Sequence, residues 1–238
     1  MLFNVPLSPP KADQLIDVLN LSAVDRVLDV GCGSGEFLIR LVEATGVSAV
    51  GIDINPDLIT QAQQKAAERV PNGAIEFRTA DVADGLPGPP FDTALCLGST
   101  HAFAMGQDAY PEALIGLQKA VRPGGQILIG EGYWKQHPDH DYVEFIGDPV
   151  GIYHSHAENV EFAEKQGLVP LYAITANQDE WDHFEWSHHL EIERGAKGRR
   201  EEPAVMEALE RSRSWRKGYL RWGRDTMGFG YYLFGTPE

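Results

Sequence analysis

The chain has 238 residues, of which 43% are hydrophobic, and its formal net charge is −15. This length and composition suit one domain with a real core. The strong negative charge argues against nucleic acid as a partner, because the phosphate backbone would be repelled. Cys32 and Cys96 are the two cysteines, too few for a disulfide framework or a cysteine metal site.

The first ten residues, MLFNVPLSPP, have no basic stretch followed by an apolar run, so we expect no signal peptide. No apolar run approaches the length that crosses a bilayer, and we expect no membrane partner. These features predict a cytoplasmic protein. They leave open whether it is a monomer or a dimer.

Strands and helices alternate over the first half of the chain. Residues 1–20 are predicted to form an irregular, proline-containing arm and then a helix, because apolar side chains recur at helical spacing from Ala12 to Leu19. The strands predicted next span residues 26–30, 49–52, 75–79, 91–97 and 126–130. The helices predicted between them begin near residues 34, 55 and 110. Such alternation predicts an α/β fold with a doubly wound parallel sheet.

The pattern changes in the second half. A short helix is predicted over 157–166, a strand over 168–176 and a last strand over 228–234. The segment between the last two strands, residues 178–227, is helical, polar and rich in tryptophan. We expect these two strands to pair antiparallel. The inserted helices would then lie above the sheet like a lid, within a single domain of residues 1–238.

The most informative stretch is Val27–Phe37, VLDVGCGSGEF, in which an apolar run ends in an acid and Gly31, Gly33 and Gly35 follow. Glycine lets the backbone pass close under a ligand, because it has no Cβ. The next helix points its first amide groups at the same space. A second apolar run then ends in Asp53, which is placed to accept hydrogen bonds from ribose hydroxyls. This unit predicts a site for an adenosine-containing cofactor.

Two residues favour S-adenosylmethionine over a nicotinamide dinucleotide. The dinucleotide fingerprint needs glycine at position 36, where this chain has Glu36. In addition, Asp29 lies at the mouth of the turn, where it would repel a pyrophosphate and attract an ammonium group. An NAD-dependent oxidoreductase is kept as the alternative.

The motifs together make the chain resemble the class I S-adenosylmethionine-dependent methyltransferases. LDVGCGSG resembles the first motif of the family, GIDINPDLI its second-strand acid motif, and TADVAD its adenine motif. LCLGSTHAF and VRPGGQILIGEGYW resemble the segments around its fourth and fifth strands. The C-terminal part is similar to a bacterial subgroup of mostly uncharacterised members.

The resemblance implies a seven-stranded sheet of order 3-2-1-4-5-7-6 with strand 7 antiparallel. It also implies methyl transfer to a small-molecule acceptor, or cofactor binding without methyl transfer as an alternative. The residues it implies for the cofactor are Asp29, Gly31, Cys32, Gly33, Ser34, Gly35, Asp53, Ile54, Asp81, Val82, Leu97 and Gly98. Among these, Asp81 would bind the adenine amino group and Val82 would lie beside the ring.

The catalytic candidates are His101 and Glu131, because a side chain that accepts a proton near the methyl group can assist transfer. His101 could instead only shape the pocket, and Glu131 could be a strand-end carboxylate with a local partner. The candidates for binding the acceptor follow the fourth and fifth strands or lie in the insertion: they are Ser99, Thr100, Tyr133, Trp134 and Trp181. Tyr133 and Trp134 could stack on a flat acceptor or pack the lid onto the sheet.

Two further patterns concern the histidines and the basic residues. The chain has eight histidines, but their spacing completes no metal site, and none is expected. Basic residues gather in 194–225, where Arg221 and Arg224 are candidates for an anionic acceptor. The interleaved glutamates favour a solvated helix face instead.

Overall fold

The computed structural model describes residues 1–238 except 72, 89 and 148–149. Within that part of the chain, seven strands form one sheet in the order β3-β2-β1-β4-β5-β7-β6. Their bounds are β1 (Arg26–Val30), β2 (Ser48–Asp53), β3 (Ile75–Thr79), β4 (Phe91–Leu97), β5 (Val121–Trp134), β6 (Val169–Thr175) and β7 (Met227–Gly235). Strands β1 to β5 run parallel, and β7 is antiparallel to both of its neighbours. The strand order and the antiparallel β7 confirm the prediction.

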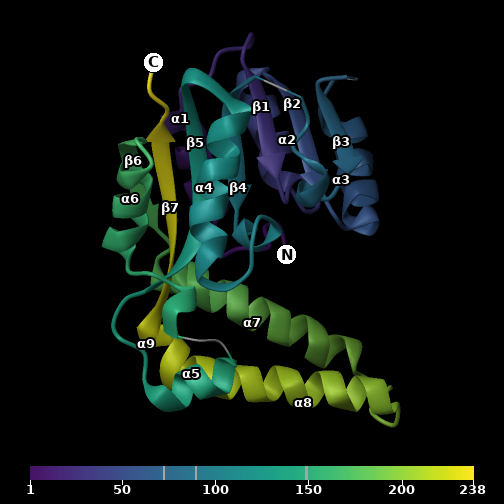
Figure 1. Cartoon of the computed structure of the whole chain (residues 1–238). Helices are drawn as coiled ribbons and strands as arrows, with labels where there is room; N and C mark the ends of the chain where they lie inside the picture. Colours follow the sequence, from purple (N-terminus) through teal and green to yellow (C-terminus); the bar gives the residue numbers. More distant parts are fainter. Residues whose placement is uncertain (72, 89, 148–149) are drawn as a thin grey trace.

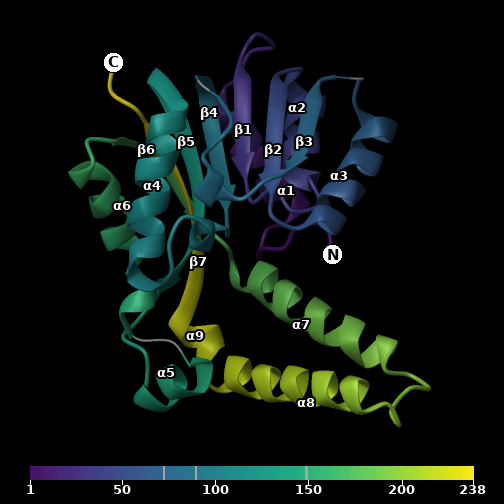
Figure 2. The same cartoon turned by 45° about the vertical axis from the view of Figure 1, so that its right-hand side comes forward.

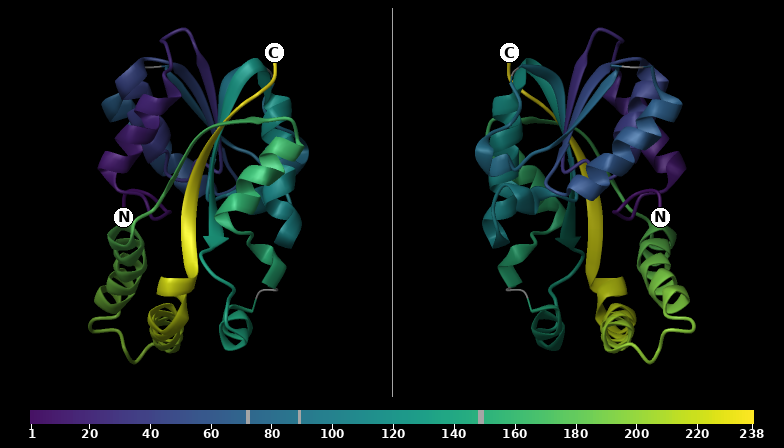
Figure 3. Two further views of the ribbon diagram at one scale, coloured as in Figure 1. Left: turned by 90° about the vertical axis from the view of Figure 1, so that its left-hand side faces the viewer. Right: turned by 90° about the vertical axis from the view of Figure 1, so that its right-hand side faces the viewer.

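Helices cover both faces of this sheet (Figure 1; Figure 3 shows the sheet edge-on). One face carries α1 (Pro9–Leu19), α2 (Glu36–Thr45) and α3 (Pro56–Arg69). The other face carries α4 (Ala109–Ala120) and α6 (His156–Lys165). The short helical segments are η1 (Val82–Asp84), η2 (Thr100–Ala102), η3 (Gly106–Asp108), α5 (His140–Ile146) and η4 (Val150–Ile152).

Local sequence explains where the covering helices begin and end. The Ser8 side chain accepts a hydrogen bond from the Lys11 amide at the start of α1. The Asn55 side chain caps α3 in the same way, and Pro56 occupies the first turn, where its missing amide hydrogen is not needed. Gly46 ends α2 in the left-handed conformation, at a φ of +74°.

A helical hairpin lies beyond the ends of the strands, below the sheet in Figure 2. It consists of α7 (Gln178–Gly195) and α8 (Pro203–Gly218), followed by a π-helical turn η5 (Tyr219–Gly223) and α9 (Arg224–Thr226). The strands β1 and β2 point toward it. It connects β6 to β7, so the segment predicted as an insertion emerges at the end of the sheet where the parallel strands finish.

Two boundaries differ from the sequence prediction. The second helix begins at Glu36 instead of near Ser34, because Gly33 and Gly35 adopt positive φ angles of 54° and 76°. Strand β5 starts at Val121 and continues to Trp134, whereas the sequence predicted 126–130 after a sharp break. Val121 already pairs with Phe91, and antiparallel pairing with β7 extends the other end of β5 to Trp134. Among the described helices, none combines the length and apolar character needed to cross a membrane.

Candidate active site

The turn after β1 is held tightly to the neighbouring strands. The amides of Gly31 and Cys32 donate hydrogen bonds of 2.8 and 3.0 Å to the carbonyl of Ile52 on β2. A Cβ on Gly31 would collide with the Ser99 side chain, and one on Gly35 would collide with Phe77. A Cβ on Gly33 would meet no described atom within 4 Å, although its φ is +54°. Gly33 is therefore the glycine of this turn that faces open space.

Two acids flank the turn. Asp53, at the tip of β2, accepts hydrogen bonds of 2.9 Å from the amides of Gly33 and Asn55, one on each carboxylate oxygen. Each oxygen keeps a lone pair for a ligand. Asp29 lies beneath the turn and is only 4% exposed. Burial, and then the nearby charge of Asp53, raise the pKa of Asp29 to about 7.

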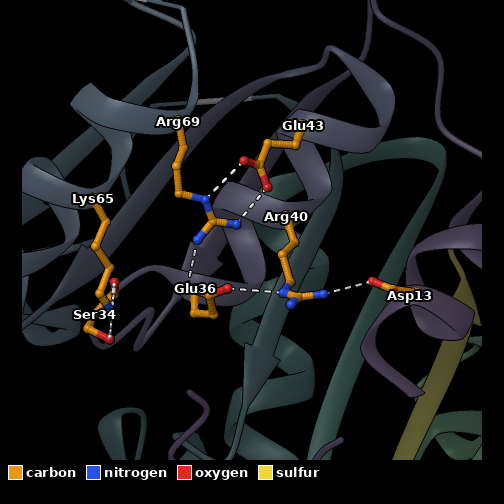
Figure 4. Close-up of polar contacts among 7 residues, drawn as sticks. All are labelled: Asp13, Ser34, Glu36, Arg40, Glu43, Lys65 and Arg69. Carbon is orange, nitrogen blue, oxygen red and sulfur yellow. Dashed lines mark hydrogen bonds and ion pairs between the residues drawn. The ribbon is translucent and has the colours of Figure 1, made fainter. Parts of the chain in front are cut away.

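Charged side chains brace the turn from behind (Figure 4). Lys65 of α3 donates a hydrogen bond of 2.7 Å to the Ser34 hydroxyl. Glu36, at the start of α2, pairs with Arg40 at 3.0 Å and with Arg69 of α3 at 2.8 Å. This network ties the start of α2 to α3, so the turn keeps its shape.

The turn and its two flanking acids line a cleft of about 500 Å³, which we call the glycine-turn cleft. Its lining includes Asp29, Gly31, Cys32, Gly33, Ser34, Asp53, Leu97, Gly98 and Ser99. Residues 1–5 and Leu7 of the N-terminal arm also line it, together with His188 and Glu191 of α7. The arm therefore lies between the sheet and the hairpin, against the cleft.

Four residues implied for the cofactor lie outside this lining: Gly35, Ile54, Asp81 and Val82. Ile54 is 68% exposed, next to Asp53. Asp81 accepts a hydrogen bond of 2.9 Å from the Ala83 amide and caps η1. The Ala80 amide donates a hydrogen bond of 3.0 Å to the Asp53 carbonyl, so the end of β3 lies beside the end of β2. Asp81 is the next residue and therefore lies close to Asp53.

A second cavity, of about 330 Å³, lies next to the first and is called the aromatic cavity. Its rings come from widely separated elements: they belong to Tyr110, Tyr142, Phe145, Tyr153, Trp181, Phe184, Trp215, Tyr219 and Phe229. The two cavities share Asn4, Val5, Gly98 and His101 in their linings. Ligands bound in the two cavities would therefore come closest to each other at the end of β4.

A carboxylate lies at this junction. Glu131 of β5 lines the aromatic cavity, accepts a hydrogen bond from the Thr100 hydroxyl, and accepts another of 2.8 Å from the Gly132 amide. Burial raises the pKa of Glu131, and the two hydrogen bonds only partly oppose this. His101, on η2, is exposed and lines both cavities. The structure thus brings His101, Thr100 and Glu131 together.

Three of the predicted acceptor residues, Ser99, Tyr133 and Trp134, do not line the aromatic cavity. Ser99 lines the glycine-turn cleft and donates a hydrogen bond of 3.3 Å to the Gly31 carbonyl. Tyr133 packs against His156, with ring centroids 5.3 Å apart, and Trp134 meets Tyr153 edge-to-face, also at 5.3 Å. Neither Tyr133 nor Trp134 lines a described cavity. Both residues belong to the last part of the longer β5, and Tyr153 packs against Trp134 and beside Gly132.

Trp181 does line the aromatic cavity, and Phe184 and Glu185 lie there with it. Their i, i+3 and i, i+4 spacing on α7 indicated one helix face, but sequence alone did not give its position. Tyr142 and Trp215 were missed, because nothing local links α5 and α8 to this site. Arg224 pairs with Asp182 at 2.9 Å, and Arg221 lies over the Trp222 ring; neither arginine lines the cavity.

Comparisons with known proteins agree with this geometry. Residues 27–125 match a family model described as a methyltransferase domain. The chain is 28% identical to the uncharacterized protein YjhP of Escherichia coli, covering 95% of this chain and 91% of that one. It is 30% identical to 27-O-demethylrifamycin SV methyltransferase of Amycolatopsis mediterranei over 70% of this chain and 62% of the relative.

A solved structure is similar over the whole chain. It is a SAM-dependent methyltransferase from Geobacter sulfurreducens in complex with S-adenosyl-L-homocysteine. The TM-score is 0.90 at 26% sequence identity, and the match covers 99% of this chain and 94% of that one. The likeness thus extends beyond the sheet to the helical hairpin.

Proposed function

Because this chain belongs to the class I S-adenosylmethionine-dependent methyltransferases, we propose that the glycine-turn cleft holds the cofactor and the aromatic cavity receives a small-molecule acceptor. The main support for this proposal is that the two cavities share lining residues at the end of β4. A donor and an acceptor in adjoining cavities can be aligned for in-line transfer. The cofactor is S-adenosylmethionine, and the reaction is methyl transfer.

The described residues fit such a cofactor. The open space in front of Gly33 leaves room for a ligand against the backbone. Asp53 has free lone pairs for ribose hydroxyls. The ammonium group of the methionine part would favour the charged form of Asp29 and so lower its raised pKa. Ile54, Asp81 and Val82 would hold the adenine at the strand ends beside the cleft. When bound, S-adenosylmethionine supplies an electrophilic methyl carbon on a sulfonium.

The protein's own part in the reaction is to position the acceptor, exclude water and remove a proton. The arm and α7 cover the cleft, and the aromatic rings keep the second cavity apolar. Glu131 and His101 are the groups that would accept a proton from an O–H or N–H acceptor. Thr100 would act by orienting Glu131, because its hydroxyl donates to that carboxylate.

We also propose a cytoplasmic location. Cys32 and Cys96 are free thiols, as is usual for proteins of a reducing compartment. The high negative charge supports a small-molecule acceptor over nucleic acid.

Calorimetry with S-adenosylmethionine, S-adenosylhomocysteine and NAD tests the cofactor assignment. Binding of the first two in the micromolar range, with none of NAD, is the expected result. Binding of NAD alone would overturn the assignment. Formation of S-adenosylhomocysteine with a mixture of small-molecule acceptors then separates a methyltransferase from a protein that only binds the cofactor.

A further inference from the structure

The charges that line the aromatic cavity are unbalanced. Glu131 of β5 and Glu185 of α7 both contribute to the wall. Among the described residues of the lining, none is lysine or arginine. The nearby Arg224 is already paired with Asp182, so it does not neutralise either glutamate. Two carboxyl groups therefore line the cavity with no lysine or arginine beside them among the described lining residues.

Each carboxylate keeps hydrogen-bonding capacity for a ligand. Glu131 accepts from the Thr100 hydroxyl on one oxygen and from the Gly132 amide on the other. Glu185 accepts a hydrogen bond of 2.8 Å from the Trp215 indole on Oε2, and this is its one hydrogen bond within the described part of the chain. Burial raises the pKa of both carboxyl groups, because a charge away from water is unfavourable unless it is paired. A cation brought by the acceptor would relieve this cost.

The aromatic residues of the wall also suit a cationic ligand. The rings of Trp181, Phe184 and Trp215 lie in the lining, and aromatic faces attract a cation as well as a flat apolar group. The cavity thus offers aromatic faces beside two acidic groups.

We propose that the methyl acceptor is an amine on a flat, apolar body, which binds as its ammonium cation. Glu131 and Glu185 recognise the cation, and the aromatic rings hold the body. For transfer to the nitrogen, Glu131 would accept an N–H proton, because only the neutral amine has a lone pair for the methyl group. This inference rests on the proposed function of the aromatic cavity. It excludes carboxylate and phosphate compounds as preferred acceptors, because both glutamates would repel them.

Binding to protein saturated with S-adenosylhomocysteine tests this without requiring turnover. The probes are tyramine, 2-(4-hydroxyphenyl)ethanol and 3-(4-hydroxyphenyl)propionate, which share one body and differ in charge. We expect tyramine to bind at least about tenfold more tightly than the alcohol, and the acid to bind weakest. Equal affinity for tyramine and the alcohol, preference for the acid, or no binding of any probe would each overturn the inference.

The role of Glu185 is tested by a matched pair of variants on α7. Glu185→Gln should weaken tyramine binding about tenfold and leave binding of the alcohol unchanged. Glu193→Gln is the control, because Glu193 also lies on α7 but pairs with Arg213 outside the cavity. A Glu185→Gln protein that binds tyramine like the parent would contradict the assignment. Thermal unfolding checks that both variants are folded.

Failure of the cofactor assignment is distinguishable from all of these results, because S-adenosylhomocysteine would then not bind in the first place.

Discussion

The Gly33 amide donates a hydrogen bond of 2.9 Å to Oδ2 of Asp53, which joins the turn after β1 to the tip of β2. The same carboxylate accepts from Asn55 at the start of α3. One side chain therefore orients the turn, the next helix and the face offered to a ligand.

Replacing Asp53 should weaken cofactor binding. In Asp53→Ala, a charged acceptor for the ribose and the anchor of the Gly33 amide are both lost. We expect affinity for S-adenosylhomocysteine to fall about 10- to 100-fold, as for other hydrogen bonds to charged groups. Asp57→Ala is the control, because Asp57 is an exposed acid nearby and does not line the cleft. Calorimetry of the two variants decides, and equal affinities would remove Asp53 from the site.

A methyl group at position 33 should weaken cofactor binding while it leaves the protein folded. The residue has a φ of +54°, and its Cβ would meet no described atom. Gly33→Ala should therefore lower the free energy of unfolding by only about 1 kcal/mol. Its affinity for S-adenosylhomocysteine should fall at least about tenfold, because the new methyl enters the space assigned to the ligand.

Gly46→Ala is the matched control for that experiment. Gly46 has a φ of +74° at the end of α2, and its Cβ would be 3.5 Å from Ala23, away from the cleft. It should lose similar stability and keep full affinity. If Gly33→Ala bound the cofactor as well as Gly46→Ala does, the cofactor could not lie against the turn.

Asp29 should give stability a characteristic dependence on pH. Its pKa is raised to about 7 in the folded protein, above the roughly 3.9 of an unfolded chain. Between these values the folded state holds a proton that the unfolded state has lost. This group therefore makes the folded protein less stable as the pH rises from about 4 to about 7.

Urea unfolding of the cofactor-free protein at about pH 5 and about pH 8 measures this effect. The parent should lose more stability between the two values than Asp29→Asn, which cannot ionise. The difference between the two proteins isolates Asp29 from every other titrating group. A parent and a variant that respond identically to pH would show that Asp29 ionises freely in the folded protein.

The ion pair between Lys11 and Glu180 should hold the N-terminal arm in place. Both residues are buried, and Lys11 also donates a hydrogen bond of 2.7 Å to the Thr175 carbonyl. Removing one partner leaves a buried charge, so Lys11→Met should lower the free energy of unfolding by about 3 kcal/mol. Bound S-adenosylhomocysteine should also dissociate faster, because the arm lines the cleft.

The double variant Lys11→Met with Glu180→Gln serves as the comparison. It has no unpaired buried charge and should recover part of the lost stability. Chemical denaturation and stopped-flow dissociation measure the two effects. An unchanged dissociation rate in a destabilised Lys11→Met protein would mean that the arm does not restrain the cofactor.

Thr100 should set the protonation of Glu131. Its hydroxyl donates to the carboxylate and favours the charged form, which opposes the effect of burial. In Thr100→Val the pKa of Glu131 should rise further. The acidic limb of the pH–rate profile of methyl transfer should then move to higher pH, with any acceptor that turns over. Lower rates at every pH, with the acidic limb unmoved, would indicate a structural role for Thr100.

The arrangement of the glycine turn beside Asp53 was predictable from the sequence because it is local. Gly31, Gly33 and Asp53 belong to one strand–turn–helix–strand unit, in which spacing fixes relative position. The strand order, by contrast, came from the resemblance to a family and was confirmed. The periodicity of apolar residues does not predict the strand order, because pairing between strands depends on contacts between residues far apart in the sequence.

The acceptor side was not predictable to the same degree. Tyr133 and Trp134 were expected in the crevice because they follow the predicted end of the fifth strand. Pairing of β5 with β7 lengthens that strand and moves them elsewhere. Glu185 and Trp215 come together through the packing of α7 on α8, which no local pattern encodes.

The two cavities draw on different parts of the chain. Apart from His101 and Tyr110, the aromatic residues that line the aromatic cavity lie outside residues 27–125, the span that matches the methyltransferase-domain model. The glycine turn and Asp53 lie inside it. Substitutions at the α5 and α8 residues of the aromatic cavity should therefore change its shape and leave the glycine turn as it is, because neither helix lines the glycine-turn cleft.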